Sequence, residues 1–268
     1  MGGVSLANLY FLFFLFVLVT FQVTVDAQTN PIVPDRPGFS TGAYTVKPGR
    51  LNIEFGYQYS FKDHNTKSDT SIHTAPLSNL RVGITNKIEF DILWDGWNID
   101  DQEDSNPETS VADASLGGKY RIIEIDKFNL TALGLLSFPV GSSPSTSGHV
   151  DPRLGLLWDY SLSNSVSIFG NVLANSDVTK GDRNYSIQPI VGVSFSHTSR
   201  LGTYLEYNSD IPLHTGASSE PGSSSVQNTI NGGVTYLLTD DIQLDINAGV
   251  GLDSETDNFI GTGFSIRF

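Results

Sequence analysis

The chain has 268 residues, a formal net charge of −14, 16% charged residues and no cysteine. The acidic balance excludes a nucleic-acid-binding surface, which requires an excess of basic side chains. The absence of cysteine excludes a disulfide framework, a thiolate metal site, a thiol nucleophile and a lipoprotein anchor.

Residues 1–27 have the organisation of a secretory signal peptide. Leu9–Val19 is an unbroken apolar run of 11 residues, whereas a membrane-spanning helix needs about 20. Val25-Asp26-Ala27 then offers small residues for cleavage before Gln28. The residues before the run include no Lys or Arg, so an uncleaved N-terminal anchor is the alternative. We expect the chain to be secreted through the inner membrane.

Residues 28–49, which we call the lead segment, are rich in proline and glycine. Proline resists both helices and central strands, so no regular element is expected here. Ile32, Val33 and Phe39 favour packing against other parts of the chain. The segment is therefore expected either to enter the following domain as a plug or to remain a periplasmic tail.

Residues 50–268 predict one β-barrel domain, because apolar and polar side chains alternate with a period of two. Arg50–Lys62 has the clearest alternation, and strand side chains alternate between two faces. Long two-faced strands after a signal peptide are typical of barrels whose apolar face meets lipid. Twelve strands are predicted, at 50–62, 71–84, 87–95, 111–122, 129–139, 152–160, 165–174, 186–196, 200–208, 226–237, 242–251 and 259–268.

The connections between these strands alternate in length. Those at 85–87, 161–164, 197–199 and 238–241 are tight, and 123–128 is somewhat longer. The connections 63–70, 96–110, 140–151, 175–185, 209–225 and 252–258 are longer and polar. Short periplasmic turns and long extracellular loops are the outer-membrane pattern. The alternative is a soluble β-sandwich, which gives no reason for short connections at one end of the strands and long connections at the other.

The predicted inward face is polar and carries seven acids and seven bases. Charges in a narrow lumen are expected to pair, because an isolated buried charge is costly. The pairs would either stiffen a filled barrel or line a polar path for solutes. The residues are Glu54, Lys62, Arg81, Lys87, Glu89, Asp91, Asp113, Lys119, Arg121, Arg153, Asp159, Glu206, Asp245 and Arg267.

Apolar side chains share the inward parity in one sector, on the fifth to ninth predicted strands. They predict either a route for hydrophobic small molecules or a contact surface for the lead segment or a folded-in loop. The residues are Leu133, Leu135, Leu157, Phe169, Leu173, Ile190 and Tyr204.

Several short segments together resemble a known family. They are Asp35-Arg36-Pro37-Gly38-Phe39-Ser40, Val46-Lys47-Pro48-Gly49, residues 113–121, Phe138-Pro139-Val140-Gly141, residues 236–245 and residues 263–268. In this order they resemble the outer-membrane transporter-like family "putative MetA-pathway of phenol degradation". The resemblance implies a bacterial outer-membrane β-barrel, sometimes linked to uptake of aromatic or other hydrophobic compounds, and it carries over no catalytic residues.

Two other features suggest chemistry only weakly. His197 and Ser199 have the spacing used by outer-membrane lipid hydrolases, but spacing without geometry is weak evidence, and turn hydrogen bonding explains it. The acidic loop from Asp95 to Glu108 could bind Ca²⁺ or bridge to lipid head groups, yet a solvated charged run is the simpler explanation. We therefore predict no catalytic residue, no metal site and no cofactor.

The expected function is passive transport of small molecules, including hydrophobic or aromatic ones, across the bacterial outer membrane. The alternatives are a closed structural barrel and a lipid-modifying enzyme. The expected partners are outer-membrane lipid, the solute and the barrel-assembly machinery, for which Phe264, Ile266 and Phe268 at the C-terminus resemble the recognition signal.

Overall fold

The computed structural model describes residues 30–62, 70–102, 106–179, 181–214, 225–254 and 256–268. The predicted signal peptide, residues 1–27, lies outside them. Every strand belongs to one compact unit, Pro31–Phe268. The described residues contain no helix that is both long enough and apolar enough to cross a membrane.

The described residues form one antiparallel sheet of fourteen strands. In chain order these are β1 (Leu51–Lys62), β2 (Thr70–Gly83), β3 (Ile88–Trp94), β4 (Trp97–Gln102), β5 (Glu108–Val111), β6 (Ala114–Ile125), β7 (Phe128–Phe138), β8 (Asp151–Ser161), β9 (Val166–Thr179), β10 (Asp182–Ser196), β11 (Leu201–His214), β12 (Gln227–Thr239), β13 (Ile242–Gly251) and β14 (Asn258–Arg267).

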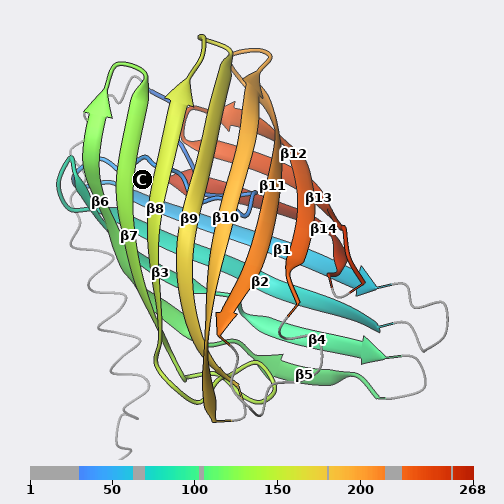
Figure 1. The fold of residues 1–268 in the computed structure, drawn as a ribbon. Coiled ribbons are helices and arrows are strands. Elements are labelled where there is room, and N and C mark those ends of the chain that lie inside the picture. Colours follow the sequence, from blue (N-terminus) through green and yellow to red (C-terminus); the bar gives the residue numbers. More distant parts are fainter. Residues whose placement is uncertain (1–29, 63–69, 103–105, 180, 215–224, 255) are drawn as a thin grey trace, which may run out of the picture. The chain divides into compact units, whose positions relative to one another are not determined.

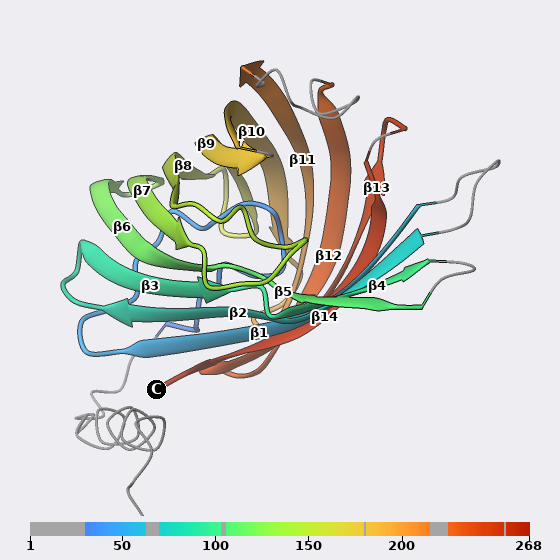
Figure 2. The ribbon, with the colours of Figure 1, turned by 90° about the horizontal axis from the view of Figure 1, so that it is seen from below.

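Twelve of these strands close into a barrel, as the sequence predicts (Figures 1 and 2). They are β1, β2, β3 and β6 to β14. The ring closes because β1 pairs with β2 on one side and with β14 on the other, with Phe55 opposite Phe264. Closure leaves no unpaired strand edge in the ring, which is the condition for a sheet to lie in a membrane.

The alternation in the sequence explains the two faces of the wall. On β13, Ile246 is 60% exposed and points outward, whereas its neighbours Asp245 and Asn247 are 4% and 7% exposed and point inward. Val191 on β10 and Ile260 on β14 are likewise exposed on the outer surface. An apolar outer surface around a polar interior is the arrangement of membrane barrels.

The prediction that residues 96–110 form a loop is wrong in part, because this segment contains the hairpin of β4 and β5. β4 pairs with the first half of β2, from Thr70 to Ala75, while β3 pairs with the second half. Gly96 has a φ of 61° between β3 and β4, and a Cβ there would collide with the backbone of Ala75 and Pro76. Figure 1 shows β4 and β5 beside the projecting ends of β1 and β2. Residues 103–105 lie outside the described residues.

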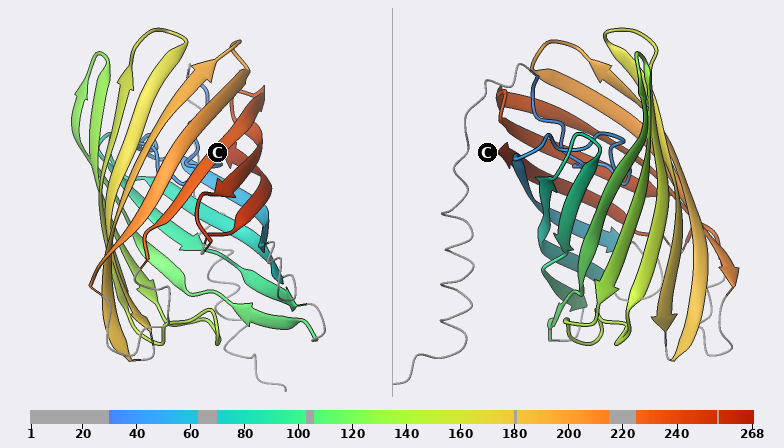
Figure 3. Two further views of the ribbon diagram at one scale, coloured as in Figure 1. Left: turned by 45° about the vertical axis from the view of Figure 1, so that its right-hand side comes forward. Right: turned by 90° about the vertical axis from the view of Figure 1, so that its left-hand side faces the viewer.

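Other strands run further than predicted. The predicted loop 175–185 is mostly strand, since β9 ends at Thr179 and β10 begins at Asp182. β11 continues to His214, into the predicted loop 209–225. β6 and β7 leave only two residues between Ile125 and Phe128, so that connection is also a tight turn. Figure 3 shows the length of these strands, with β9 to β11 in yellow to orange.

The short connections lie at one rim of the barrel, and the two ends of the strand series meet there. Leu51 and Phe268 exchange main-chain hydrogen bonds of 3.2 and 2.8 Å. The part of the lead segment from Pro31 to Gly49 lies inside the ring of strands, as the blue trace in Figure 2 shows. The interior of the barrel is therefore a lumen with a segment of the same chain in it.

Candidate functional site: the lumen and the lead segment

Carboxylates of the barrel wall hold the main chain of the lead segment. Glu54 on β1 accepts hydrogen bonds from the N–H groups of Asp35 and Arg36, at 3.0 to 3.1 Å. Glu206 on β11 accepts from the N–H groups of Phe39 and Ser40. A charged acceptor makes such bonds about twice as strong as neutral ones, so these contacts fix the course of the segment.

Neutral side chains add further contacts along the segment. Asn171 on β9 both accepts from the Thr41 N–H (2.7 Å) and donates to the Thr41 carbonyl (3.0 Å). The Thr131 hydroxyl on β7 donates to the carbonyl of Ala43. On the opposite wall, Asn247 of β13 donates to the carbonyl of Pro37 at 3.0 Å. The segment is thus bonded to strands on several sides of the lumen.

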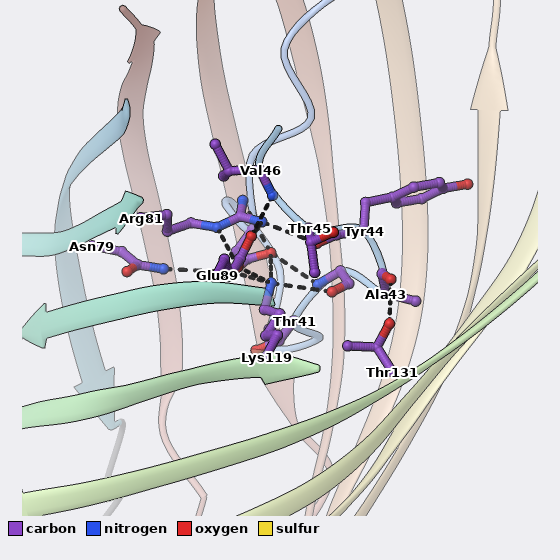
Figure 4. Close-up of polar contacts among 12 residues, drawn as sticks. Thr41, Ala43, Tyr44, Thr45, Val46, Asn79, Arg81, Glu89, Lys119 and Thr131 are labelled. Carbon is purple, nitrogen blue, oxygen red and sulfur yellow. Dashed lines mark hydrogen bonds and ion pairs between the residues drawn. The ribbon is translucent and has the colours of Figure 1, made fainter. Parts of the chain in front are cut away.

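A network of buried ion pairs lies where the lead segment meets β1, β2, β3 and β6 (Figure 4). Arg81, which is 1% exposed, pairs with Glu89 at 3.0 Å and with Glu54 at 3.1 Å. Lys119 pairs with Glu89 at 3.1 Å and with Asp35 of the lead segment at 2.8 Å. Because Arg81, Glu54, Glu89 and Lys119 are buried, each needs its partners, and Asp35 joins the network to the lead segment.

Two glycines leave space on the inner face of the wall for the side chain of Arg36. Its guanidinium pairs with Asp245 on β13 at 3.1 Å. It lies over Gly56 of β1 and Gly263 of β14, which are directly opposite each other in the ladder. A Cβ at either glycine would collide with this guanidinium, so the two glycines provide the space that the segment needs.

Tyr44 joins the segment to β8. Its hydroxyl donates a hydrogen bond of 2.6 Å to Asp159. Burial raises the pKa of the Tyr44 hydroxyl well above its usual range, and the hydrogen bond to Asp159 raises it further. The phenol therefore stays protonated and keeps donating at any pH at which the barrel is expected to work.

An apolar cluster lies on the inner face of β7 to β10, against the lead segment. Leu157 is fully buried in it, and Phe39 of the lead segment packs against it. We call this cluster the apolar partition; it consists of Ala43, Leu133, Leu135, Leu157, Leu173 and Ile190. Five of its members come from the wall, and Ala43 comes from the lead segment.

Cavities lie on both sides of the apolar partition. The short-turn cavity, of about 280 Å³, lies toward the short connections and is bordered by Ala43, Tyr44, Trp158, Phe169 and Tyr204, among others. The long-loop cavity, of about 510 Å³, lies toward the long connections and is bordered by Leu135 and many polar side chains. The partition, the lead segment and buried polar side chains such as Asn171, Glu206 and Asn208 lie between the two.

A family model described as "Putative MetA-pathway of phenol degradation" matches residues 34–268 of the chain. The chain belongs to this family. The match begins within the lead segment and includes the whole barrel, so the predicted resemblance is confirmed. No curated protein sequence matches the chain.

Solved structures similar to this family member are outer-membrane barrels. A COG4313 outer membrane channel from Pseudomonas putida F1 has a TM-score of 0.61 at 16% identity, covering 87% of this chain and 99% of that one. The NanC porin has a TM-score of 0.53 at 12% identity, covering 81% and 98%. The KdgM porin in complex with disordered oligogalacturonate has a TM-score of 0.52 at 9% identity, covering 81% and 99%. At these identities the likeness concerns the fold.

The structure brings together many of the predicted lumen residues. Glu54, Arg81, Glu89, Asp91 and Lys119 are gathered around the ion-pair network, and Glu206 and Asp245 contact the lead segment. Arg121 bonds to Thr45 of the lead segment and to the Asn86 carbonyl. Leu133, Leu135, Leu157 and Leu173 form the apolar partition, while Phe169 and Tyr204 border the short-turn cavity.

Three other predicted inward charges lie away from the lead segment, and two of them, Asp113 and Arg153, border the long-loop cavity. Lys87 is exposed in the turn before β3, because that strand begins one residue later than expected. Asp113 lies between β5 and β6, where its carboxylate accepts from Gly141, Thr146 and Ser147 and so anchors that loop. Arg153 is exposed at the long-loop cavity, where it bonds to Asn175.

Sequence reasoning missed Asp35, Arg36, Thr131 and Asn171 as lumen residues. The alternation could have placed Thr131 and Asn171 on the inner face, but it gives no reason to single them out. The paired glycines at 56 and 263 were a signal for a bulky side chain at that point of the lumen, since both lie at inward positions.

The remaining predicted candidates lie at the rims and on the outer surface. Phe264 and Phe268 are exposed, on β14 and at the C-terminus. His197 lies in the turn between β10 and β11, and its Nε2 is 2.7 Å from the Thr203 hydroxyl. Among the described residues no group of three or more His, Cys, Asp or Glu side chains could hold a metal ion.

Proposed function

We propose that this protein is a passive transporter of small apolar or aromatic molecules in the bacterial outer membrane. The observation that carries the proposal is the apolar partition, which lies between two cavities that face opposite rims. An apolar solute loses little by replacing water with such side chains, whereas an ion loses its hydration. The partition therefore favours the passage of apolar solutes over ions.

The lining of the short-turn cavity supports the same class of solute. Trp158, Phe169, Tyr204 and Tyr44 border it, together with main-chain and hydroxyl groups. Concave sites for small molecules are mostly apolar and aromatic with a few polar groups that orient the ligand. A volume of about 280 Å³ admits a one-ring aromatic molecule.

A closed structural barrel is the second candidate. It is favoured by the hydrogen bonds and ion pairs that join the lead segment to the wall on several sides. On this alternative the segment stiffens the barrel and no solute crosses. A lipid-modifying enzyme has less support, because His197 bonds to Thr203 in a turn at the short-turn rim.

The proposal includes the surroundings of the protein. The exposed apolar outer surface is suited to contact outer-membrane lipid. The C-terminal residues Phe264, Ile266 and Phe268 are suited to recognition by the barrel-assembly machinery, since Phe264 and Phe268 are exposed. Secretion by residues 1–27 completes this route to the outer membrane.

Uptake by bacterial cells tests the proposal. Cells that produce the protein are expected to take up a labelled neutral aromatic solute faster than cells that produce the Leu157→Asn variant, because an amide in the apolar partition is costly to leave unpaired. Leu162→Asn is the matched control, since Leu162 is 51% exposed at the rim. Equal uptake with and without the protein would favour the closed barrel.

A further inference from the structure

Carboxylates dominate the charged border of the long-loop cavity. Among the described residues that border it, the five acids face a single base, Arg153. The acids come from separate parts of the chain: Asp95, Asp113, Asp151, Asp177 and Asp210.

Few of these charges are cancelled by a cation. Arg183 pairs with Asp151 at 3.2 Å, which leaves an excess of three acids when both arginines are counted. Among the described residues, Asp177 accepts hydrogen bonds from the neutral side chains of Thr179 and Asn184. Oδ1 of Asp210 is buried and has no hydrogen-bond partner in the described structure.

Deeper in the lumen, Glu206 and Asp91 form no ion pair with any of the described residues. Glu206 is bonded to the main chain of Phe39 and Ser40 and to the Asn231 amide. Asp91 is 1% exposed, and its Oδ1 has no hydrogen-bond partner in the described structure. The cations in this region, Arg36, Arg81 and Lys119, are each paired with a carboxylate, so they do not offset the negative charge of the cavity.

Such a cavity acts on solutes through its field. A cleft lined by charges of one sign focuses the field and raises the local concentration of oppositely charged solutes about 10- to 1000-fold. Salt screens this over about 8 Å at physiological ionic strength, a length comparable with the cavity itself. No three of the described carboxylates are grouped to hold a metal ion, so the effect is a diffuse one.

We propose that the long-loop cavity selects solutes by charge, admitting neutral and cationic molecules and repelling anionic ones. Asp177 and Asp210 are the residues that determine this selection. The inference rests on the proposed function, since selection at one mouth affects uptake only if solutes enter there. Among aromatic solutes, alcohols and amines are therefore admitted, and carboxylates and sulfonates are excluded.

Thiol reactivity tests the inference without requiring transport. Ser137 on β7 borders the cavity, and the chain has no native cysteine. The full protein with Ser137→Cys, purified in detergent, is reacted with a cationic methanethiosulfonate (the trimethylammonioethyl reagent) and an anionic one (the sulfonatoethyl reagent). The rate with the cationic reagent is divided by the rate with the anionic reagent. Dividing this by the same quotient for a free thiol in the same buffer gives the normalised ratio, which is expected to be about 10.

Matched variants identify the source of the selection. Adding Asp177→Asn and Asp210→Asn to Ser137→Cys is expected to lower the normalised ratio several-fold, and adding Asp126→Asn at the other rim is expected to leave it unchanged. A thiol at Ser163→Cys, in the exposed turn after β8, should give a ratio near one. High salt should reduce the ratio at Ser137→Cys toward that value.

Three results would overturn the inference: a normalised ratio within about twofold of one at Ser137→Cys, no change on removing the two carboxylates, or no reaction with either reagent. The thiol reactions do not depend on passage through the barrel. If the ratio is high while cells gain no uptake of neutral aromatic solutes, the proposed transport function fails and the charge selection of the cavity stands.

Discussion

Replacing Arg81 with methionine tests whether the ion-pair network stabilises the barrel. Arg81 is 1% exposed and pairs with both Glu54 and Glu89, and it also donates to the carbonyls of Val33 and Tyr44 in the lead segment. Methionine would leave Glu54 buried without a cation and Glu89 with Lys119 as its only remaining cation among the described residues. Breaking a buried pair by removing one partner costs about 3–5 kcal/mol, so Arg81→Met is expected to lose that much free energy of unfolding.

The free energy of unfolding can be measured by urea titration of the protein in lipid vesicles, followed by tryptophan fluorescence. Arg200→Met is the control, because Arg200 is exposed in a turn; its change should stay within about 0.5 kcal/mol. Adding Glu54→Gln to Arg81→Met should recover part of the loss, since the uncompensated charge of Glu54 is then gone, whereas Glu89 keeps Lys119 as its partner. A loss below about 1 kcal/mol for Arg81→Met would refute the view that this network holds the lead segment.

Three further predictions concern the outer surface and the lead segment. Ile246→Arg should hinder membrane insertion at a cost of about 2–4 kcal/mol, whereas Ser194→Arg, which borders the short-turn cavity, should insert more readily; equal insertion efficiency in a vesicle-folding assay would contradict the assigned faces. Glu206→Gln should weaken the hold on Phe39 and Ser40 by about 1–3 kcal/mol and speed proteolysis of the lead segment, which gel analysis and mass spectrometry would detect; an unchanged rate would contradict the assigned role of Glu206. Because the pKa of the Tyr44 hydroxyl is raised on folding, its contribution to stability is complete below the ordinary tyrosine pKa of about 10 and is lost as the pH rises through the higher folded value. Urea titrations should therefore show a steeper loss of stability above about pH 10 in the unaltered protein than in Tyr44→Phe, and parallel curves would refute this.

The wall of the barrel could be predicted from sequence because the membrane imposes the alternation. A residue that faces lipid must be apolar and its neighbour that faces the lumen can be polar, so β1 and β13 were located to within one residue. Beyond the membrane both faces of a strand can be exposed to water, so apolar and polar residues no longer need to alternate. For this reason Asp177 and Asp182 belonged to a predicted loop, although both lie on strands.

The hairpin of β4 and β5 was missed for a similar reason. Asp100 and Asp101 give it the composition of a loop, yet both lie in β4, opposite Ile72 and Ser71 of β2. Its outward residues Trp97 and Ile99 are apolar and exposed, which is the pattern of a strand. The alternation covers only a few residues of β4, so in the sequence the acidic residues beside it favoured a loop.

The contacts of the lead segment could not be predicted, because many of them are made by its main chain. Glu54, Glu206 and Asn171 were at inward positions in the predicted strands, but their partners are N–H and carbonyl groups of residues 35–41. Main-chain groups look alike in every sequence. The apolar partition was easier to foresee, since Leu133, Leu135, Leu157 and Leu173 share one parity on neighbouring strands.

Photolabelling with an aromatic solute tests the central claim most directly. A small neutral aromatic compound carrying a diazirine is added to cells that produce the protein, activated by light, and located on the chain by mass spectrometry. We expect labels on Leu135, Leu157 and Phe169, which line the route from the long-loop cavity to the short-turn cavity, and we expect excess unlabelled solute to suppress them. Labels confined to lipid-facing residues such as Leu156, and unaffected by competing solute, would contradict transport through the lumen.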